Sequence, residues 1–520
     1  MSPSARRAAV GPTIALAILI GATVLGRRVA ASSASATSWR VAGVGALVIA
    51  ALLPARAARF ALVAVASLAI GMAAGAIAEQ RATWGAALPT PDPVPIRVVL
   101  RADPGGHPFA QSVPATTVQV GAVPIRRTVL LRGSARVALR FAVLRLGDRV
   151  DLIGRIEAGG RGDRFRPGPP VAAEIDVAAL LAVRPASQWY RRAGDGLRAA
   201  VESGADRLGD RDRALLLGFL LGDTRAIDRT TIDQFRAAGL THLLAVSGAN
   251  VAFVLALVGP ALRRAPIVTR NAAGLSVVLV FAAATRFEPS VLRASAMAAV
   301  VMSARMSGRV VSPIRSLLIA VYGLLAWDAD LLTSVGFRLS VVATAGIALF
   351  AGRVRERIRG PAAVRDAIAV TAAAQVAVAP FLVAEFGSFP AAGLIANLLA
   401  APAAEPLTMY GMVAAPLAGV LPARAGAVVM APCAWMLDGV RGVAALASRV
   451  PVRIDRPGLL VIIAVVSAIA ITARARRGLR RTEPSDDPDL VFESEVGSEP
   501  QPEPEHGGGP PGLRRSSRLR

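Results

Sequence analysis

Apolar blocks of membrane-spanning length recur along the 520 residues of this chain, and they constrain its fold more than any other feature. Hydrophobic residues make up 54% of the sequence. A transmembrane helix needs about 20 consecutive, predominantly apolar residues. A chain this long and this apolar does not fit one soluble domain. The sequence therefore predicts a polytopic α-helical membrane protein.

Residues 1–87 predict an N-terminal membrane segment with two or three spans, because short apolar runs alternate with arginines there. Arg6 and Arg7 precede the first run, so a cleaved signal peptide is the alternative for that run. More hydrophobic runs follow at once, and an uncleaved span is therefore the preferred interpretation.

Residues 88–186 have a different character, with frequent Pro, Gly and charged residues. Turn residues separate five short β-rich runs, which are 96–100, 116–120, 128–131, 149–157 and 172–183. About five strands in a segment of this size suit a small barrel such as an OB-fold. We therefore expect an inserted, OB-fold-like soluble domain on the extracytoplasmic side. OB-folds often bind single-stranded nucleic acid by base stacking. The aromatic candidates are Phe109, Phe141 and Phe165, any of which could belong to the core.

The second half of the chain returns to membrane character. Residues 187–238 predict amphipathic, interfacial helices, and residues 239–475 predict a transmembrane bundle. The arginine-rich loop 352–365 and the arginine-rich segment 474–481 favour the cytoplasmic side. Residues 476–520 predict a disordered cytoplasmic tail. The bundle is expected to hold about seven to ten spans, near 240–260, 271–286, 290–305, 316–332, 334–351, 366–386, 388–402, 405–421, 424–447 and 458–473.

The charged and metal-binding residues exclude several classes of protein. The formal net charge is +24, and all 59 basic residues are arginine. A P-loop requires lysine, so the chain is not a P-loop motor. Its three histidines are widely separated and form no His-Glu-x-x-His motif. The single cysteine, Cys433, excludes an intramolecular disulfide and a cysteine-rich metal site. We expect no cofactor, no metal and no catalytic activity.

The segment Gly239–Val251 places His242, Ser247 and Asn250 in an otherwise apolar stretch. Polar groups are expensive in hydrocarbon and usually mark a bundle interior or a transport pathway. His242 could instead be interfacial, Ser247 and Gly248 could permit close helix packing, and Asn250 could form an interhelical hydrogen bond. A Ser247 nucleophile with His242 as its base is disfavoured, because residues five positions apart do not face each other well on a helix.

Arg293 and Arg338 also lie inside apolar blocks, where a charge needs a partner, water or headgroups. Two interpretations stay open for each arginine. One is contact with phosphate in a pathway. The other is a structural ion pair, of Arg293 with Glu288 and of Arg338 with Asp328 or Asp330.

Five local patterns occur here in the same order as in the membrane domain of the ComEC family of competence proteins. They are Leu216–Asp223 leading into Phe235–Val251, then Pro289–Met297, Ser334–Gly346, Gln375 with Pro380, and Phe389–Pro402. The chain resembles this family closely over about residues 210–420. Over residues 12–185 the similarity to the family's amino-terminal region is only in outline.

The resemblance implies a multi-pass channel that takes up single-stranded DNA across the cytoplasmic membrane during natural transformation. Its partners would be single-stranded DNA, the lipid bilayer, a DNA receptor, a cytoplasmic motor and a separate nuclease. Gln375 and Asn397 could alternatively bridge helices. The expected DNA pathway contains His242, Ser247, Gly248, Asn250, Arg293, Arg338, Gln375 and Asn397.

Two departures from the family pattern are visible. Many members carry His where Asn250 stands, so a role that needs imidazole protonation is excluded at this position. Larger members end in a metallo-β-lactamase-like domain, which we expect this chain to lack. Two other functions stay open: transport of another anionic substrate, such as a lipid or a cell-wall precursor, and a membrane-embedded enzyme that uses Ser247 or a carboxylate.

Overall fold

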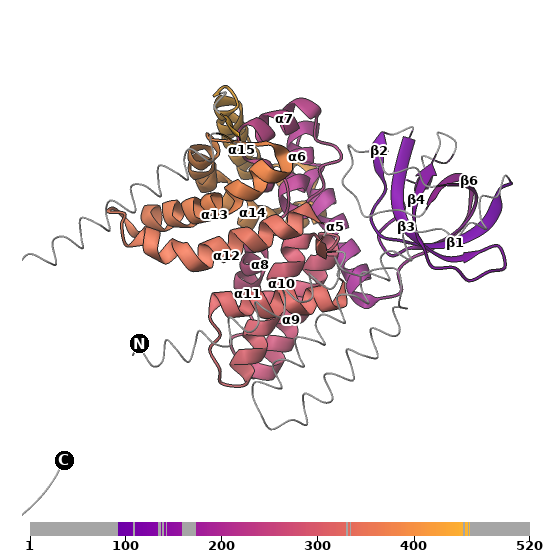
Figure 1. Cartoon of the computed structure of the whole chain (residues 1–520), viewed down its shortest axis with the longest axis horizontal. Coiled ribbons are helices and arrows are strands. Elements are labelled where there is room, and N and C mark those ends of the chain that lie inside the picture. The colour runs from indigo at the N-terminus through magenta and orange to yellow at the C-terminus, as the bar shows by residue number, and fades with distance from the viewer. Residues whose placement is uncertain are drawn as a thin grey trace, which may run out of the picture. The chain divides into compact units, whose positions relative to one another are not determined.

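A computed structural model describes residues 92–457 (Figure 1), apart from gaps at 108–109, 134–136, 138–139, 142, 159–172, 329–330, 333, 451–452 and 456. The predicted spans in residues 1–87, the span near 458–473 and the predicted tail lie outside the described residues. The described part contains a small β-barrel followed by a bundle of helices (Figure 1). This architecture confirms the predicted fold class.

The barrel has the strand order of an OB-fold. Its sheet runs β1-β5-β6-β4-β3 and closes through pairing of β1 with β3. All these pairings are antiparallel except that of β4 with β6. A short extra strand, β2 (Gly105–His107), pairs with the start of β3. The barrel strands are β1 (Val94–Leu100), β3 (Ala110–Val120), β4 (Thr128–Gly133), β5 (Arg149–Ala158) and β6 (Ala173–Arg184).

Alternation of side chains along the strands builds the barrel core. On β1, Ile96 and Val98 are buried, whereas Arg97 points outward and pairs with Asp151 at 2.6 Å. Phe141 is fully buried in the same core, and Phe109 and Phe165 lie outside the described residues. The described strands therefore carry no exposed aromatic ring for base stacking.

The helical part begins at α5 (Trp189–Ala205) and α6 (Asp210–Leu221), two separate helices. Gly222 has φ +72° and ends α6, because glycine adopts the left-handed conformation without steric cost. The other helices in the described part of the chain are α7 (Arg229–Ala237), the 3₁₀ turn η1 (Thr241–Leu243), α8 (Gly248–Val258), α9 (Ile267–Ala284), α10 (Pro289–Met306), α11 (Pro313–Trp327), α12 (Val335–Arg355), α13 (Ala362–Phe386), α14 (Gly393–Val420) and α15 (Ala423–Ala447).

Among the residues that the structure describes, five segments are long and apolar enough to cross a membrane, by length and composition: 241–258, 267–284, 335–355, 362–386 and 423–447. Two predictions of spans need correction. The segment expected at 240–260 starts with the η1 turn, and its helix begins only at Gly248. The spans expected at 388–402 and 405–421 form the single helix α14, which continues through three internal prolines. Proline usually breaks a helix, but membrane helices tolerate it when neighbouring groups satisfy the freed carbonyls.

Helix α5, in the segment expected at the membrane interface, packs against α9 and α14. Glycines make this packing possible, since small residues let helix backbones approach closely. A Cβ at Gly194 would press on the backbone of Ala284, and one at Gly204 would overlap the carbonyl oxygen of Ala415. The pair β7 (Ser388–Pro390) and β8 (Arg453–Asp455) joins the segment before α14 to the segment after α15.

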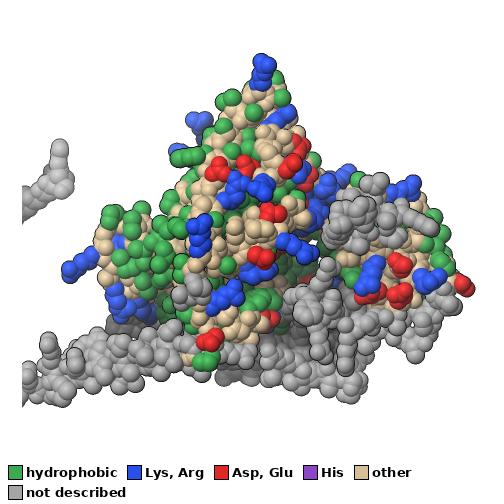
Figure 2. Space-filling view, turned by 90° about the horizontal axis from the view of Figure 1, so that it is seen from above, with side chains coloured by type: hydrophobic (Ala, Val, Ile, Leu, Met, Phe, Trp, Pro, Cys, Tyr) green, Lys and Arg blue, Asp and Glu red, His purple; other side chains and the backbone are tan. Residues whose placement is uncertain are grey.

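Large hydrophobic side chains are exposed on the outside of the bundle. Figure 2 shows a broad area of hydrophobic side chains on the helical part, with few charged side chains within it. On α12 and α13 the exposed residues include Leu349, Phe350, Val370 and Val376. An apolar surface of this kind is expected of helices that face lipid.

Candidate functional site

His242 and Asn397 are brought together from distant parts of the chain. The Nε2 atom of His242, in η1, lies 3.2 Å from Oδ1 of Asn397, in the first turns of α14. Gly239 allows this approach, because its φ is +73° and a Cβ there would lie 2.9 Å from Cα of Gly393. Gln375 also borders Gly393, with Nε2 3.4 Å from the position of a Cβ. His242, Gln375 and Asn397, three predicted pathway residues, thus lie together at the start of α14.

Ser247 and Asn250 lie at the start of α8. The hydroxyl of Ser247 donates to Oδ1 of Asn250 at 3.0 Å, and Nδ2 of Asn250 donates to the carbonyl of Phe219 in α6 at 3.5 Å. Asn250 is buried. These contacts agree with the interhelical hydrogen bond considered from the sequence, and they orient the first turn of α8.

Arg293, in α10, is only 7% exposed and directs its guanidinium to the same turn. A Cβ at Gly248 would overlap Nη2 of Arg293, so glycine permits this close approach. Nε donates to Oγ of Ser340 in α12 at 2.9 Å, and Nη1 lies 3.2 Å from Sδ of Met297. Among the described residues no carboxylate forms an ion pair with Arg293, and the pair considered with Glu288 is not formed.

Arg338 has a different environment. Its Nη2 lies 3.1 Å from Oε1 of Glu385, and its guanidinium sits 4.9 Å from the ring centre of Phe381, both in α13. Its carboxylate partner among the described residues is therefore Glu385, whereas Asp330, one of the partners considered from the sequence, lies outside the described residues. This ion pair and cation–π contact link α12 to α13, which supports the structural interpretation of Arg338.

A network of paired charges, missed from the sequence, joins the barrel to the bundle. Nε of Arg286 lies 2.7 Å from Oδ2 of Asp103, in the loop after β1, and Nη1 lies 2.5 Å from Oδ1 of Asp195 in α5. Nη1 of Arg225 donates to the carbonyl of Pro104 at 3.0 Å. Arg286 and the adjacent Phe287 have φ near +60°, which is uncommon for residues other than glycine.

Asp223 is the shared acid of this network. The buried Arg198, 3% exposed at its side chain, pairs with Asp223, and Nε of Arg225 donates to Asp223 at 2.8 Å. Burial raises the pKa of Asp223, but the hydrogen bonds and charges of Arg225 and Arg198 outweigh it and bring the pKa to about 2. Asp223 therefore stays ionised and holds two arginines. The sequence feature that could have drawn attention to Asp223 is its position directly after Gly222, the glycine that ends α6.

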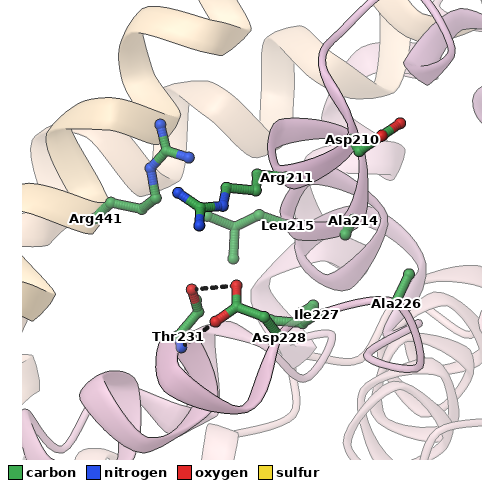
Figure 3. Close-up of a pocket in the computed structure, with 9 residues that line it drawn as sticks. All are labelled: Asp210, Arg211, Ala214, Leu215, Ala226, Ile227, Asp228, Thr231 and Arg441. Carbon is green, nitrogen blue, oxygen red and sulfur yellow. Dashed lines mark hydrogen bonds between the residues drawn. The ribbon is translucent and has the colours of Figure 1, made fainter.

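A small pocket of about 100 Å³ lies between α6, α7 and α15, and Figure 3 shows the residues that line it. Arg211 and Arg441 line one side of it, across from Thr231 and Asp228 (Figure 3). Nη1 of Arg441 pairs with Asp212 at 2.9 Å, and Asp228 accepts the N–H of Thr231 at 2.8 Å. The charges around the pocket are thus balanced. None of the described residues forms a group of three or more His, Cys, Asp or Glu side chains placed to hold a metal ion.

The fold and these contacts define a multi-pass membrane protein that combines an OB-like barrel with buried polar side chains in its helical bundle. The model of the Competence protein family matches residues 219–478, half of the chain, and the chain belongs to this family. Membership gives the protein a role in DNA uptake for transformation. The match includes all eight predicted pathway residues. No curated protein and no solved structure matches the chain.

Proposed function

We propose that this protein is a channel that passes single-stranded DNA across the cytoplasmic membrane. The observation that carries the proposal is the meeting of polar side chains from α8, α10 and α12 around one buried arginine. Arg293 faces Gly248 and bonds Ser340, and Asn250 orients the same turn of α8. An unneutralised cation in an apolar bundle is costly and marks a functional site by default. A polyanion that passes the bundle needs such donors to replace its hydration.

The remaining predicted residues would extend the path. His242, Asn397 and Gln375 meet at the start of α14 and offer amide and imidazole groups to the strand. Arg338 is held by Glu385 and would contribute a weaker phosphate contact. Weak contacts suit transport, because conduction requires binding that is favourable enough to enter and weak enough to leave.

The helices α8, α9 and α10 suggest how the protein is oriented. Nδ2 of Asn271, near the start of α9, donates to the carbonyl of Met302, near the end of α10, so these helices are antiparallel. The end of the bundle with the α8–α9 and α10–α11 connections has arginines and no acidic residue in 259–271 and 303–312. Loops with an excess of arginine favour the cytoplasmic side of the membrane. The opposite end carries Arg286, which binds Asp103 of the barrel, so the barrel would lie outside the membrane.

Cysteine labelling tests this orientation. In a Cys433→Ala background, Val143→Cys in the barrel should react with a membrane-impermeant maleimide in cells whose outer layers admit the reagent. Val310→Cys should react only after the cytoplasmic membrane is permeabilised. Both valines are exposed, at 70% and 97%, so accessibility to the reagent depends on the side of the membrane. Labelling of Val310→Cys alone in intact cells would reverse the proposed orientation.

A transport role fits the contacts of Ser247 better than catalysis does. Its hydroxyl donates to Asn250, while His242 binds Asn397, so the possible nucleophile and base are engaged separately. We therefore propose that the chain is not an enzyme. It would depend on a receptor that delivers DNA outside, a cytoplasmic motor that pulls the strand and a separate nuclease. Normal transformation by a Ser247→Ala variant would support this view, because an essential Ser247 nucleophile would be lost.

Deletion of the gene tests the channel against transport of another anionic substrate. The deletion strain should bind labelled DNA at its surface but fail to move it into a nuclease-protected compartment. Electroporation bypasses uptake, so DNA delivered in this way should integrate normally. Plasmid-borne wild type should restore uptake. Normal internalisation in the deletion strain would overturn the proposal and favour a lipid or cell-wall precursor as the substrate.

A further inference from the structure

We propose that Arg293 and the first turn of α8 form a binding site for one phosphodiester group of the strand. The inference rests on the proposed channel function and names the atoms that would hold the DNA backbone inside the bundle. The anion would bridge the guanidinium of Arg293 and the backbone N–H groups of Gly248 and Ala249.

The first turn of α8 has free donors. Ser247 precedes the helix, but its side chain makes no capping hydrogen bond and instead donates to Oδ1 of Asn250. The N–H of Asn250 is used by the carbonyl of Ser247. Within the described part of the chain, no hydrogen bond engages the N–H groups of Gly248 and Ala249. Such donors and the helix dipole favour an anion at this end of a helix.

The side chain of Arg293 is a separate feature that points to the same site. It is more than nine-tenths buried and is aimed at this turn, so near that a Cβ at position 248 would displace Nη2. Two of its nitrogens are held, Nε by Ser340 and Nη1 by Met297, which fixes the plane of the guanidinium. Nη2, the atom nearest Gly248, has no hydrogen-bond partner among the described residues. A buried guanidinium with a free nitrogen lacks the carboxylate that normally compensates it.

Neighbouring contacts hold the two halves of this site together. The hydroxyl of Ser290, in the first turn of α10, donates to the carbonyl of Val246 just before α8. Asn250 fastens the other side of the turn to α6. Ala249 is exposed and Gly248 is half-buried, so the turn is open to an incoming group. Arginine and backbone N–H groups together match the oxygens of a phosphodiester, and the absence of base contacts suits transport of any sequence.

The test measures oligonucleotide binding to the full chain, purified in a phosphate-free maltoside detergent. The probe is a fluorescent oligothymidylate, titrated at several salt concentrations. Arg293→Gln should weaken binding about tenfold, as expected for the loss of one charged hydrogen-bonded contact. It should also lower the salt slope by about 0.7, the value for one phosphate contact on a single strand. Arg305→Gln, at the exposed end of the same helix, is the matched control and should change neither value.

A second variant keeps the inference testable if Arg293→Gln does not fold. Gly248→Ala retains the arginine but adds a Cβ that displaces Nη2, so it should weaken binding in the same direction. Unchanged affinity and salt slope in both variants, with wild type still binding, would overturn the phosphate site and leave the channel proposal standing. A wild-type protein that binds no oligonucleotide would overturn both.

A lipid headgroup offers the same phosphodiester chemistry, and native mass spectrometry separates the two sources. If the strand occupies the site, added oligothymidylate should displace any phosphatidylglycerol that wild type retains and Arg293→Gln does not. Retention of that lipid through Arg293, together with oligonucleotide binding that does not depend on Arg293, would assign the site to a headgroup and overturn the inference.

Discussion

Two arginines, Arg198 at the junction of barrel and bundle and Arg293 beside α8, are almost fully buried. They differ in whether a carboxylate of the protein neutralises their charge. Arg198 pairs with Asp223 and lies 3.0 Å from Glu202. Arg293 contacts a hydroxyl and a thioether and has no carboxylate partner in the described part of the chain. Removing each guanidinium from water costs free energy, but only Arg198 gains compensating ion pairs within the protein. The comparison separates an arginine that holds the fold from one that is available to a ligand.

The largest expected effect comes from breaking the paired region. Asp223→Asn leaves Arg198 and Arg225 without their shared acid, and removal of one partner from a buried ion pair typically costs about 3–5 kcal/mol. We expect the lower end of this range, because Glu202 still contacts Arg198. Denaturant unfolding of the purified protein measures the loss. The control is Asp206→Asn, which breaks the exposed pair with Arg213 and should cost less than about 1 kcal/mol. Equal losses in both variants would contradict a special role for the junction.

Acid provides a second, smaller perturbation of the same region. The pKa of Asp223 lies at about 2, below its usual value of 3.8, so ionised Asp223 stabilises the folded state above pH 3.8. This contribution disappears as the pH falls through about 2, and the shift corresponds to about 2 kcal/mol. The unfolding free energy of wild type should therefore fall more steeply below pH 4 than that of Asp223→Asn. Parallel pH profiles for the two proteins would show that Asp223 is not the group that titrates.

The barrel and the position of the buried polar residues followed from the sequence, since both depend on local patterns. Alternating residues such as Ile96, Arg97 and Val98 reveal a strand, and Asn250 or Arg293 stands out inside an apolar block. The partners that these polar side chains contact did not follow from the sequence, because they depend on how the helices rotate and pack. Glu385 is 47 residues from Arg338.

The junction was missed for a related reason. Asp103 and Arg286 are 183 residues apart in the sequence. Both lie in polar loops, where a charged residue does not stand out. The length of α14 was also missed, because its continuation through Pro402 and Pro406 depends on tertiary packing rather than on local preference. Local patterns thus singled out the candidate residues, whereas their contacts required the folded structure.

The smallest expected effect on stability comes from removing the uncompensated arginine. Arg293→Met deletes a buried charge that has no carboxylate partner and retains much of the side-chain volume. We expect the unfolding free energy to change by less than about 1 kcal/mol, or to rise, because replacing buried charge by an apolar group is often neutral or stabilising. The measurement is denaturant unfolding with and without excess oligothymidylate. Bound ligand stabilises the folded state, so the oligonucleotide should protect wild type more than the variant. A loss as large as that of Asp223→Asn would mean that Arg293 also holds the fold, and the contrast between the two regions would fail.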